Sequence, residues 1–153
     1  MPTRISVRPF RVADMDRILE IERASFGKDA YDRKLFAELF HICGALFVVA
    51  ARGRKICGYM VTCMRGRKAP DAFELVSLAV DPVFRGQGAA SSLMKNTLHR
   101  LRLRRAVRIS LMVRETNASA RRFYDKHGFR KVRKVPEYYE DGEDGVLMTR
   151  VLR

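Results

Sequence analysis

The sequence has few cysteines and no long apolar run, and both shortages exclude whole classes of protein. The longest uninterrupted apolar stretch, residues 45–51, is far shorter than the roughly 20 residues that span a bilayer. The first ten residues lack the apolar centre of a secretory signal peptide. We therefore expect a cytoplasmic protein with no membrane partner.

The cysteines Cys43, Cys57 and Cys63 are odd in number and show neither a Cys-x-x-Cys pair nor a histidine at metal-ligand spacing. This arrangement argues against a disulfide framework and predicts no metal site. Cys57 and Cys63 stand an even number of residues apart in one apolar run, which places both on the same face of a strand. We interpret them as small core residues.

Acidic residues are also scarce, because 17 Asp+Glu face 31 Lys+Arg and leave a net charge of +14. The surplus favours a polyanionic partner, such as ribosomal RNA, or an anionic small ligand, although charge alone identifies no function. With 153 residues, of which 47% are hydrophobic, the chain is long enough to bury one core. We predict a single domain over residues 1–153.

Apolar periodicity along the chain predicts an α/β fold. Alternating apolar residues predict strands at residues 5–9, 46–51, 56–64, 72–80, 107–113, 129–135 and 146–152. Helical spacing predicts helices between Asp14 and Gly27, at residues 32–41 and 88–103, and between Asn117 and Gly128. We expect a mixed central sheet of about seven strands with about four helices, an antiparallel half joined to a parallel crossover.

The most informative stretch is residues 80–90, where a strand ends at Asp81-Pro82 and a glycine-containing loop leads into a helix. Glycine lets the backbone pass close to a ligand, and the N–H groups of a first helical turn bind anions. The Gly-Lys-Ser/Thr of a Walker loop and the third glycine of a dinucleotide fingerprint are both missing. The pattern predicts a pyrophosphate cradle, and a plain tight turn is the alternative.

The cradle sequence, Arg85-Gly86-Gln87-Gly88-Ala89-Ala90, resembles the acetyl-coenzyme A loop of the GNAT family of N-acetyltransferases, Gln/Arg-x-x-Gly-x-Gly/Ala. The resemblance covers nearly the whole chain, since residues 77–82, 111–117, 123–124 and 128–129 also match family motifs in order. Several ordered motifs are much more specific than one glycine loop. The resemblance implies the acyl-CoA N-acyltransferase fold, acetyl-coenzyme A as cosubstrate and no metal.

The resemblance also implies which residues touch the cosubstrate. The strand that ends at Val80 would hydrogen-bond the pantetheine arm, and a backbone N–H near Val80 would polarise the thioester carbonyl, as an oxyanion site does. The implied cosubstrate contacts are Leu78, Ala79, Val80, Arg85, Gly86, Gln87, Gly88, Ala89, Ala90, Asn117 and Tyr124.

Tyr124 is the candidate general acid, because the resemblance places the family's tyrosine here, with its hydroxyl toward the coenzyme sulfur. The spacing of Ala120, Phe123 and Tyr124 by itself also fits an ordinary core face. Asn117 fits two roles that are compatible, a helix N-cap on spacing and a coenzyme contact by resemblance.

The general base departs from the family pattern. RimI-like enzymes carry a glutamate in the strand after the cradle helix, but Met112 stands at that position and a thioether accepts no proton. Glu74 is the replacement we propose, because it matches the base of the histone-acetylating branch, and burial on a central strand would raise its pKa. A surface glutamate is the alternative for Glu74, and Glu20 or Glu22 is a weaker candidate base.

The late segment 137–144 contains Tyr138 and Tyr139 beside five carboxylates, and it looks like the RimI-like subgroup that acetylates protein N-termini. An aromatic pair beside acids is suited to holding a cationic peptide amine, so we predict that Tyr138 and Tyr139 bind the acceptor. A polar hairpin loop with ordinary turn residues is the alternative.

Three functions compete. The first is direct transfer of acetyl, in a ternary complex, to the N-terminal α-amine of a protein. A small amine or a lysine side chain is the second acceptor class, suggested by Met112. The third is a basic RNA- or ribosome-binding module without turnover, suggested by the charge of +14.

Overall fold

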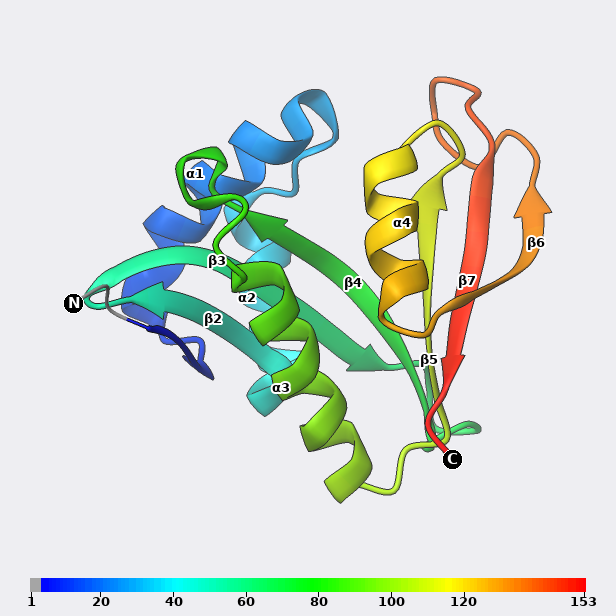
Figure 1. The fold of residues 1–153 in the computed structure, drawn as a ribbon, viewed down its shortest axis with the longest axis horizontal. Coiled ribbons are helices and arrows are strands. Elements are labelled where there is room, and N and C mark those ends of the chain that lie inside the picture. Colours follow the sequence, from blue (N-terminus) through cyan, green and yellow to red (C-terminus); the bar gives the residue numbers. More distant parts are fainter. Residues whose placement is uncertain (1–3) are drawn as a thin grey trace. The chain divides into compact units, whose positions relative to one another are not determined.

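The computed structural model describes residues 4–153 and contains the expected mixed sheet. Its seven strands are ordered β1-β2-β3-β4-β5-β7-β6 and are accompanied by four α-helices (Figure 1). β4 and β5 pair in parallel, whereas β1–β2, β2–β3, β5–β7 and β6–β7 pair antiparallel. The predicted fold class is therefore confirmed.

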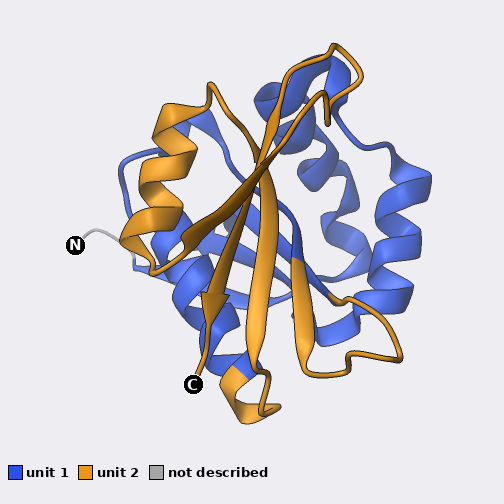
Figure 2. Ribbon diagram, turned by 90° about the vertical axis from the view of Figure 1, so that its right-hand side faces the viewer, with its two compact units in different colours: residues 1–63, 75–101 blue, residues 64–74, 102–153 orange. Residues whose placement is uncertain are grey.

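The chain forms two compact units, which Figure 2 colours separately. Unit 1 comprises Met1–Cys63 and Leu75–Leu101, and unit 2 comprises Met64–Glu74 and Arg102–Arg153. The elements that lie mainly in unit 1 are β1 (Ile5–Pro9), α1 (Met15–Phe26), α2 (Arg33–Cys43), β2 (Phe47–Arg52), β3 (Lys55–Met64), β4 (Ala72–Val80) and α3 (Ala89–Leu103). Unit 2 contains the start of β4 together with β5 (Arg108–Arg114), α4 (Ala118–Lys126), β6 (Arg130–Val135) and β7 (Gly145–Val151).

Local signals set the ends of the first two helices. Gly27 and Gly44 follow α1 and α2 with φ of 52° and 54°, a conformation that glycine adopts without strain. The Asp32 side chain caps α2 by accepting the Leu35 N–H at 2.9 Å. Asp14, predicted to cap α1, occupies that position, but its carboxylate binds Arg8 and the N–H of Arg11 instead.

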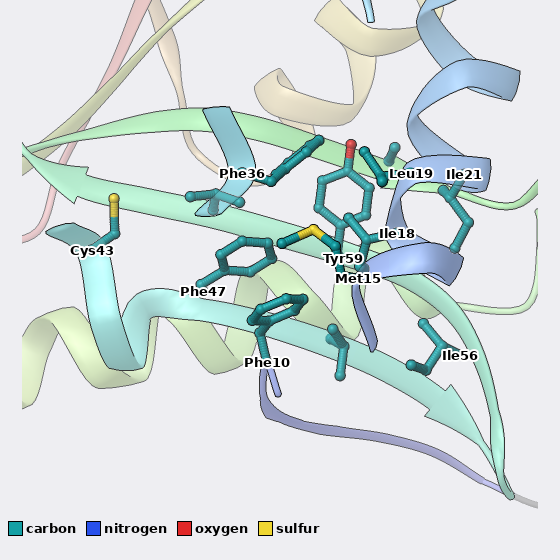
Figure 3. Packing of buried hydrophobic residues seen from close by; sticks show 13 residues of the cluster. Phe10, Met15, Ile18, Leu19, Ile21, Phe36, Cys43, Phe47, Ile56 and Tyr59 are labelled. Atoms are coloured by element: carbon teal, nitrogen blue, oxygen red, sulfur yellow. The ribbon is translucent and has the colours of Figure 1, made fainter. Parts of the chain in front are cut away.

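The core of unit 1 is aromatic and lies between α1, α2 and one face of the sheet (Figure 3). Phe10 stacks on Phe47 with ring centroids 4.2 Å apart, and Phe36 meets Tyr59 edge-on at 5.7 Å. Removing a fully buried aromatic ring costs about 3–5 kcal/mol, so this cluster is a main source of stability for the unit.

Helix α3 covers the other face of the same strands. A Cβ built on Gly58 of β3 would lie 3.4 Å from the Leu93 side chain of α3 and only 2.8 Å from the Ala79 carbonyl oxygen of β4. β3, β4 and α3 therefore approach closely at Gly58, and this packing holds the end of β4.

Unit 2 is built on the β5–β7–β6 ladder, with α4 joined to it. Phe129 is fully buried and lies 5.6 Å from the Tyr124 ring. The Asn117 side-chain oxygen Oδ1 accepts the Ala120 N–H at 3.2 Å, and Gly128 follows α4 with φ of 87°. Both predicted helix limits are confirmed.

The cysteines differ from the prediction. Cys57 is a fully buried free thiol, but Cys43, at the end of α2, forms a disulfide with Cys63 on β3, with Cα atoms 4.9 Å apart. This pair could not be predicted from the spacing of the cysteines, because α2 and β3 are brought together only by folding. Within residues 4–153, no helix is long and apolar enough to cross a membrane, and no cluster of His, Cys, Asp and Glu could hold a metal ion.

Candidate active site

The cradle predicted from the glycine pattern is an exposed loop in unit 1. Gly86 and Gly88 have φ of 78° and 87°, and a Cβ built on either would meet no atom within 4 Å. Glycine is therefore needed for backbone conformation at both positions, while the space beside them is open. Ala89 begins α3 directly afterwards, so the loop leads into the positive end of a helix dipole.

The start of the cradle is fixed from two directions. The Asp81 N–H donates a hydrogen bond to the Cys57 carbonyl at 2.8 Å. The Asp81 carboxylate accepts the Val83 N–H at 3.0 Å and pairs with Arg17 of α1. The hydrogen bond from Arg17, and then that from Val83, hold the pKa of Asp81 below its ordinary value. Sequence reasoning did not identify Arg17, since its partner lies 64 residues away.

The cradle residues differ in how far they are available to a ligand. Arg85, Gly86 and Gly88 are exposed, whereas Gln87, also exposed, accepts a hydrogen bond from Arg52 of β2. On β4, Leu78 and Val80 are half-buried and Ala79 is buried. Ala89 is buried and Ala90 half-buried at the first turn of α3. The cradle thus offers exposed backbone and one guanidinium, the groups that bind a diphosphate.

Glu74 lies on β4 as expected, but its surroundings differ from those expected of a desolvated base. It lies opposite Ser110 in the parallel pairing of β4 with β5, and its side chain is exposed. The burial expected of a catalytic base on a central strand is therefore not observed at Glu74. An exposed carboxylate still accepts a proton, which leaves Glu74 as a candidate.

Tyr124 lies on α4, half-buried between two rings. Phe123 and Phe129 contact its ring edge-on at 5.5 and 5.6 Å. Desolvation, and after it the neighbouring Tyr139, raise the pKa of Tyr124 well above its ordinary value. Its hydroxyl has no hydrogen-bond partner in the part of the chain that the structure describes, so this donor is available to a ligand.

The segment between β6 and β7, residues 136–144, is held by its own acids, and we call it the acceptor loop. Arg114, at the end of β5, binds Asp141 and Glu143, both at 2.9 Å, and lies over the Tyr139 ring at 4.1 Å. Glu143 also accepts from Thr116, which, together with Arg114, lowers the pKa of Glu143.

Lys134 completes the scaffold of the acceptor loop by pairing with Asp144 at 3.3 Å. Three of the five carboxylates are thus structural, and Glu137 and Glu140 are the acids that remain. Sequence analysis did not identify Arg114 as a scaffold residue, although it lies within the family motif at residues 111–117.

Tyr138 and Met112 lie together at the base of the acceptor loop. A Cβ built on Gly145 would come within 2.8 Å of the Met112 sulfur and 3.0 Å of the Tyr138 Cβ. Tyr138 is 50% exposed, and its ring meets that of Tyr139 at 5.0 Å. In unit 2, folding therefore places the residue that departs from the family pattern next to the predicted acceptor-binding pair.

Glu22, a weaker candidate base, is a buried anchor. Glu22 is only 1% exposed. Its carboxylate accepts hydrogen bonds from the Tyr59 hydroxyl, from the Ser77 hydroxyl at 3.2 Å and from the Tyr31 N–H at 2.9 Å. Burial, and after it the Glu22 charge, raise the pKa of Tyr59 well above its ordinary value, so the phenol remains a donor. Glu20 instead pairs with Arg17 at the surface.

Comparisons with known proteins agree with this architecture. The Acetyltransferase (GNAT) family model matches residues 15–129. An N-alpha-acetyltransferase of Sulfolobus acidocaldarius is 31% identical over 93% of this chain and 89% of its own. A putative [ribosomal protein bS18]-alanine N-acetyltransferase of Bacillus subtilis is 29% identical over 97% of this chain and 96% of its own.

The solved structure of Ard1 from Thermoplasma volcanium has a similar fold. It superposes with a TM-score of 0.90 at 28% identity, over 96% of this chain and 97% of that one. The match of the family model to most of the sequence, the order of the strands and the glycine cradle at the N-terminus of α3 lead to one conclusion. The chain is an acetyltransferase that belongs to the GNAT family.

Proposed function

We propose that this enzyme transfers acetyl from acetyl-coenzyme A to the N-terminal α-amine of a protein. The observation that carries the proposal is the exposed cradle, with two left-handed glycines directly before α3. Two relatives support the acceptor, because their names specify an α-amine in one case and the alanine of a ribosomal protein in the other.

The cradle fits the diphosphate of the cosubstrate. Backbone N–H groups of the loop and of the first turn of α3 would bind the phosphate oxygens, and Arg85 would add a charged fork. The cosubstrate supplies an acetyl group activated as a thioester. Leu78, Ala79 and Val80 would hydrogen-bond its arm through their backbone, with the N–H near Val80 directed at the carbonyl oxygen.

The acceptor amine must lose a proton before it attacks. An α-amine has a pKa near 8, so roughly a tenth is neutral at pH 7, and an exposed carboxylate such as Glu74 gives enough assistance. A lysine amine, with a pKa near 10.4, would need a stronger base. The smaller need for a base therefore favours the α-amine as acceptor.

Tyr124 would assist the leaving sulfur with a hydrogen bond. A thiol has a pKa near 8.5, and the pKa of Tyr124 lies above the ordinary 10. Full proton transfer to the thiolate would thus be uphill, whereas donation of a strong hydrogen bond is favourable. Asn117 would keep the start of α4 in place through its cap on Ala120.

The cysteines support direct transfer without an acetyl-cysteine intermediate. Cys57 is fully buried and donates to the Ala50 carbonyl, and burial raises its pKa. Cys43 and Cys63 are joined to each other. A nucleophilic cysteine needs access and a lowered pKa, and Cys57 has neither.

The test measures coenzyme A release with short peptides that differ in their first residue, each supplied with a free and with a blocked N-terminus. Release only with free N-termini is the expected result. Tyr124→Phe should lower kcat by about 10²-fold, and Glu74→Gln should lower it less, by about tenfold. Glu38→Gln, at another exposed glutamate on α2, is the matched control for Glu74→Gln.

Acetylation of lysine ε-amines in the peptides with blocked N-termini would support the second acceptor class instead. Met112 motivates that class, because it replaces the glutamate of RimI-like enzymes and contributes only an apolar surface beside Tyr138. Mass spectrometry of the product locates the acetyl group and decides between the two amines.

We also propose that the enzyme associates with RNA through its basic surface and works in the cytoplasm. Both remain predictions from the sequence. The Cys43–Cys63 disulfide bears on the cytoplasmic location, because reducing compartments keep such cysteines as free thiols. Counting the free thiols of protein isolated from its own cells measures whether the bond is present.

A further inference from the structure

Three segments of unit 2 meet where β5 begins and β7 ends (Figure 2). The N–H of Val107 donates to the Asp71 carbonyl at 2.8 Å, the N–H of Leu152 donates to the Val107 carbonyl at 2.8 Å, and the Arg153 guanidinium reaches the Arg105 carbonyl at 3.1 Å. We call this region the cationic end, and it consists of residues 65–71, 102–108 and 152–153.

The cationic end concentrates positive charge that a single acid offsets only in part. Its cations are Arg65, Arg67, Lys68, Arg102, Arg104, Arg105, Arg108 and Arg153, and all are exposed. Asp71 is the only acid in the three segments, so they contribute +7, half of the net charge of the chain. Among residues 4–153, none of the eight cations forms an ion pair with a carboxylate.

Two further observations concern arginines in and beside this region. Arg105 adopts a left-handed conformation, with φ of 59°, at the turn after α3, where glycine would be unstrained. Burial, and after it the nearby charge of Arg102, lower the pKa of Arg150 on β7. The excess positive charge thus extends beyond the loops.

The acidic acceptor loop lies at the opposite end of β5 and β7. β5 runs from Arg108 at the cationic end to Arg114, which holds the acceptor loop, and seven residues of strand span roughly 20 Å. A partner bound at the cationic end would therefore leave the acceptor loop accessible. This polarity suits an enzyme that holds one part of a target while modifying another.

We propose that the cationic end binds the phosphate backbone of folded RNA. Seven of its eight cations are arginines, whose planar forks match phosphate oxygens, and its three segments contain no aromatic residue on which a base could stack. Recognition is therefore of backbone and shape rather than of sequence. The choice of RNA rests on the proposed function, since a relative is named for a ribosomal protein, the kind of acceptor that is found on RNA.

Fluorescence anisotropy with a labelled RNA hairpin, titrated at several salt concentrations, tests the proposal. The variant Arg65→Gln/Arg67→Gln/Lys68→Gln removes three cations of the cationic end. If each contacts one phosphate, the slope of log K against log[salt] becomes shallower by about 2–3 and the affinity at about 0.1 M salt falls roughly 100-fold. The matched control, Arg130→Gln/Lys131→Gln/Arg133→Gln, removes the same charge from exposed positions on β6 and should change the affinity less than about threefold.

Equal losses in the two triple variants would overturn the proposal, because net charge rather than the cationic end would then govern binding. Equal affinity for duplex DNA, or for vesicles of anionic phospholipid, would overturn the choice of RNA. Acetylation of a short free peptide, measured in parallel, should be unchanged in both variants. A wild-type enzyme that binds RNA without acetylating any peptide would refute the proposed function alone, and one that acetylates without binding RNA would refute this inference alone.

Discussion

Gly58 offers the sharpest test of the packing that supports the proposed site. Its position on β3 faces α3, and a methyl group there would lie 2.8 Å from the Ala79 carbonyl oxygen and 3.2 Å from a methyl carbon of Val80. A carbonyl oxygen belongs to the backbone and cannot rotate away. Gly58→Ala therefore requires β4 to move from β3 by several tenths of an ångström, or the variant retains a steric clash.

Overpacking of this kind costs about 1–3 kcal/mol, and we expect about 2 kcal/mol for Gly58→Ala. For a chain of this length that corresponds to a fall in Tm of roughly 4–8 °C, measurable by calorimetry together with urea unfolding. Because Ala79 and Val80 belong to the proposed cosubstrate contacts, the KM for acetyl-coenzyme A should also rise, by about tenfold.

Gly66→Ala provides the control in the loop between β3 and β4. A Cβ at Gly66 would meet nothing within 4 Å, and Gly66 has no left-handed φ, so this change should be neutral or stabilise by up to about 1 kcal/mol. Equal stability and equal KM in the two alanine variants would refute the packing argument at Gly58.

Three further predictions concern other parts of the molecule. Burial disfavours the Asp14 charge, but the bonds from Arg8 and Arg11 outweigh it and lower its pKa, so Asp14→Asn should destabilise by about 1–3 kcal/mol at pH 7. Urea unfolding measures the difference in the free energy of unfolding between the wild type and Asp14→Asn. This difference should shrink as the pH falls below about 4, through the lowered pKa of folded Asp14, and a constant difference would contradict an ionic role. Arg105→Gly relieves a left-handed φ and should stabilise by about 1 kcal/mol, whereas a lower Tm would argue against strain. Gly145→Ala should displace the Met112 side chain, so the KM for the peptide acceptor should rise. The affinity for acetyl-coenzyme A, measured by titration calorimetry, should stay unchanged.

Much of the fold was predictable because its signals are short in sequence. The strand at residues 72–80 was predicted with the limits it has in the structure, and Gly27, Asp32, Asn117 and Gly128 mark helix ends as predicted. Alternation, capping and left-handed glycine act within a few residues, so a single sequence contains them in full. The ordered family motifs added the identity of the fold and of the ligand that the glycine cradle is expected to bind.

The candidate site was predictable only in part. The position of Glu74 on β4 followed from periodicity, but its exposure depends on what packs beside the strand. The acids beside Tyr138 and Tyr139 were expected to attract an amine, and most of them instead hold the acceptor loop through Arg114 and Lys134.

The sequence by itself determined the elements, the glycine cradle and the excess of positive charge, since each follows from residues that are neighbours in the chain. Tertiary structure alone decided which groups are buried or paired. It joined Cys43 to Cys63, enclosed Glu22 with Tyr59, and gathered the cations of three separate segments at one end of unit 2. The physical reason is that burial and pairing are properties of atoms close in space, and the partners here lie tens of residues apart in sequence.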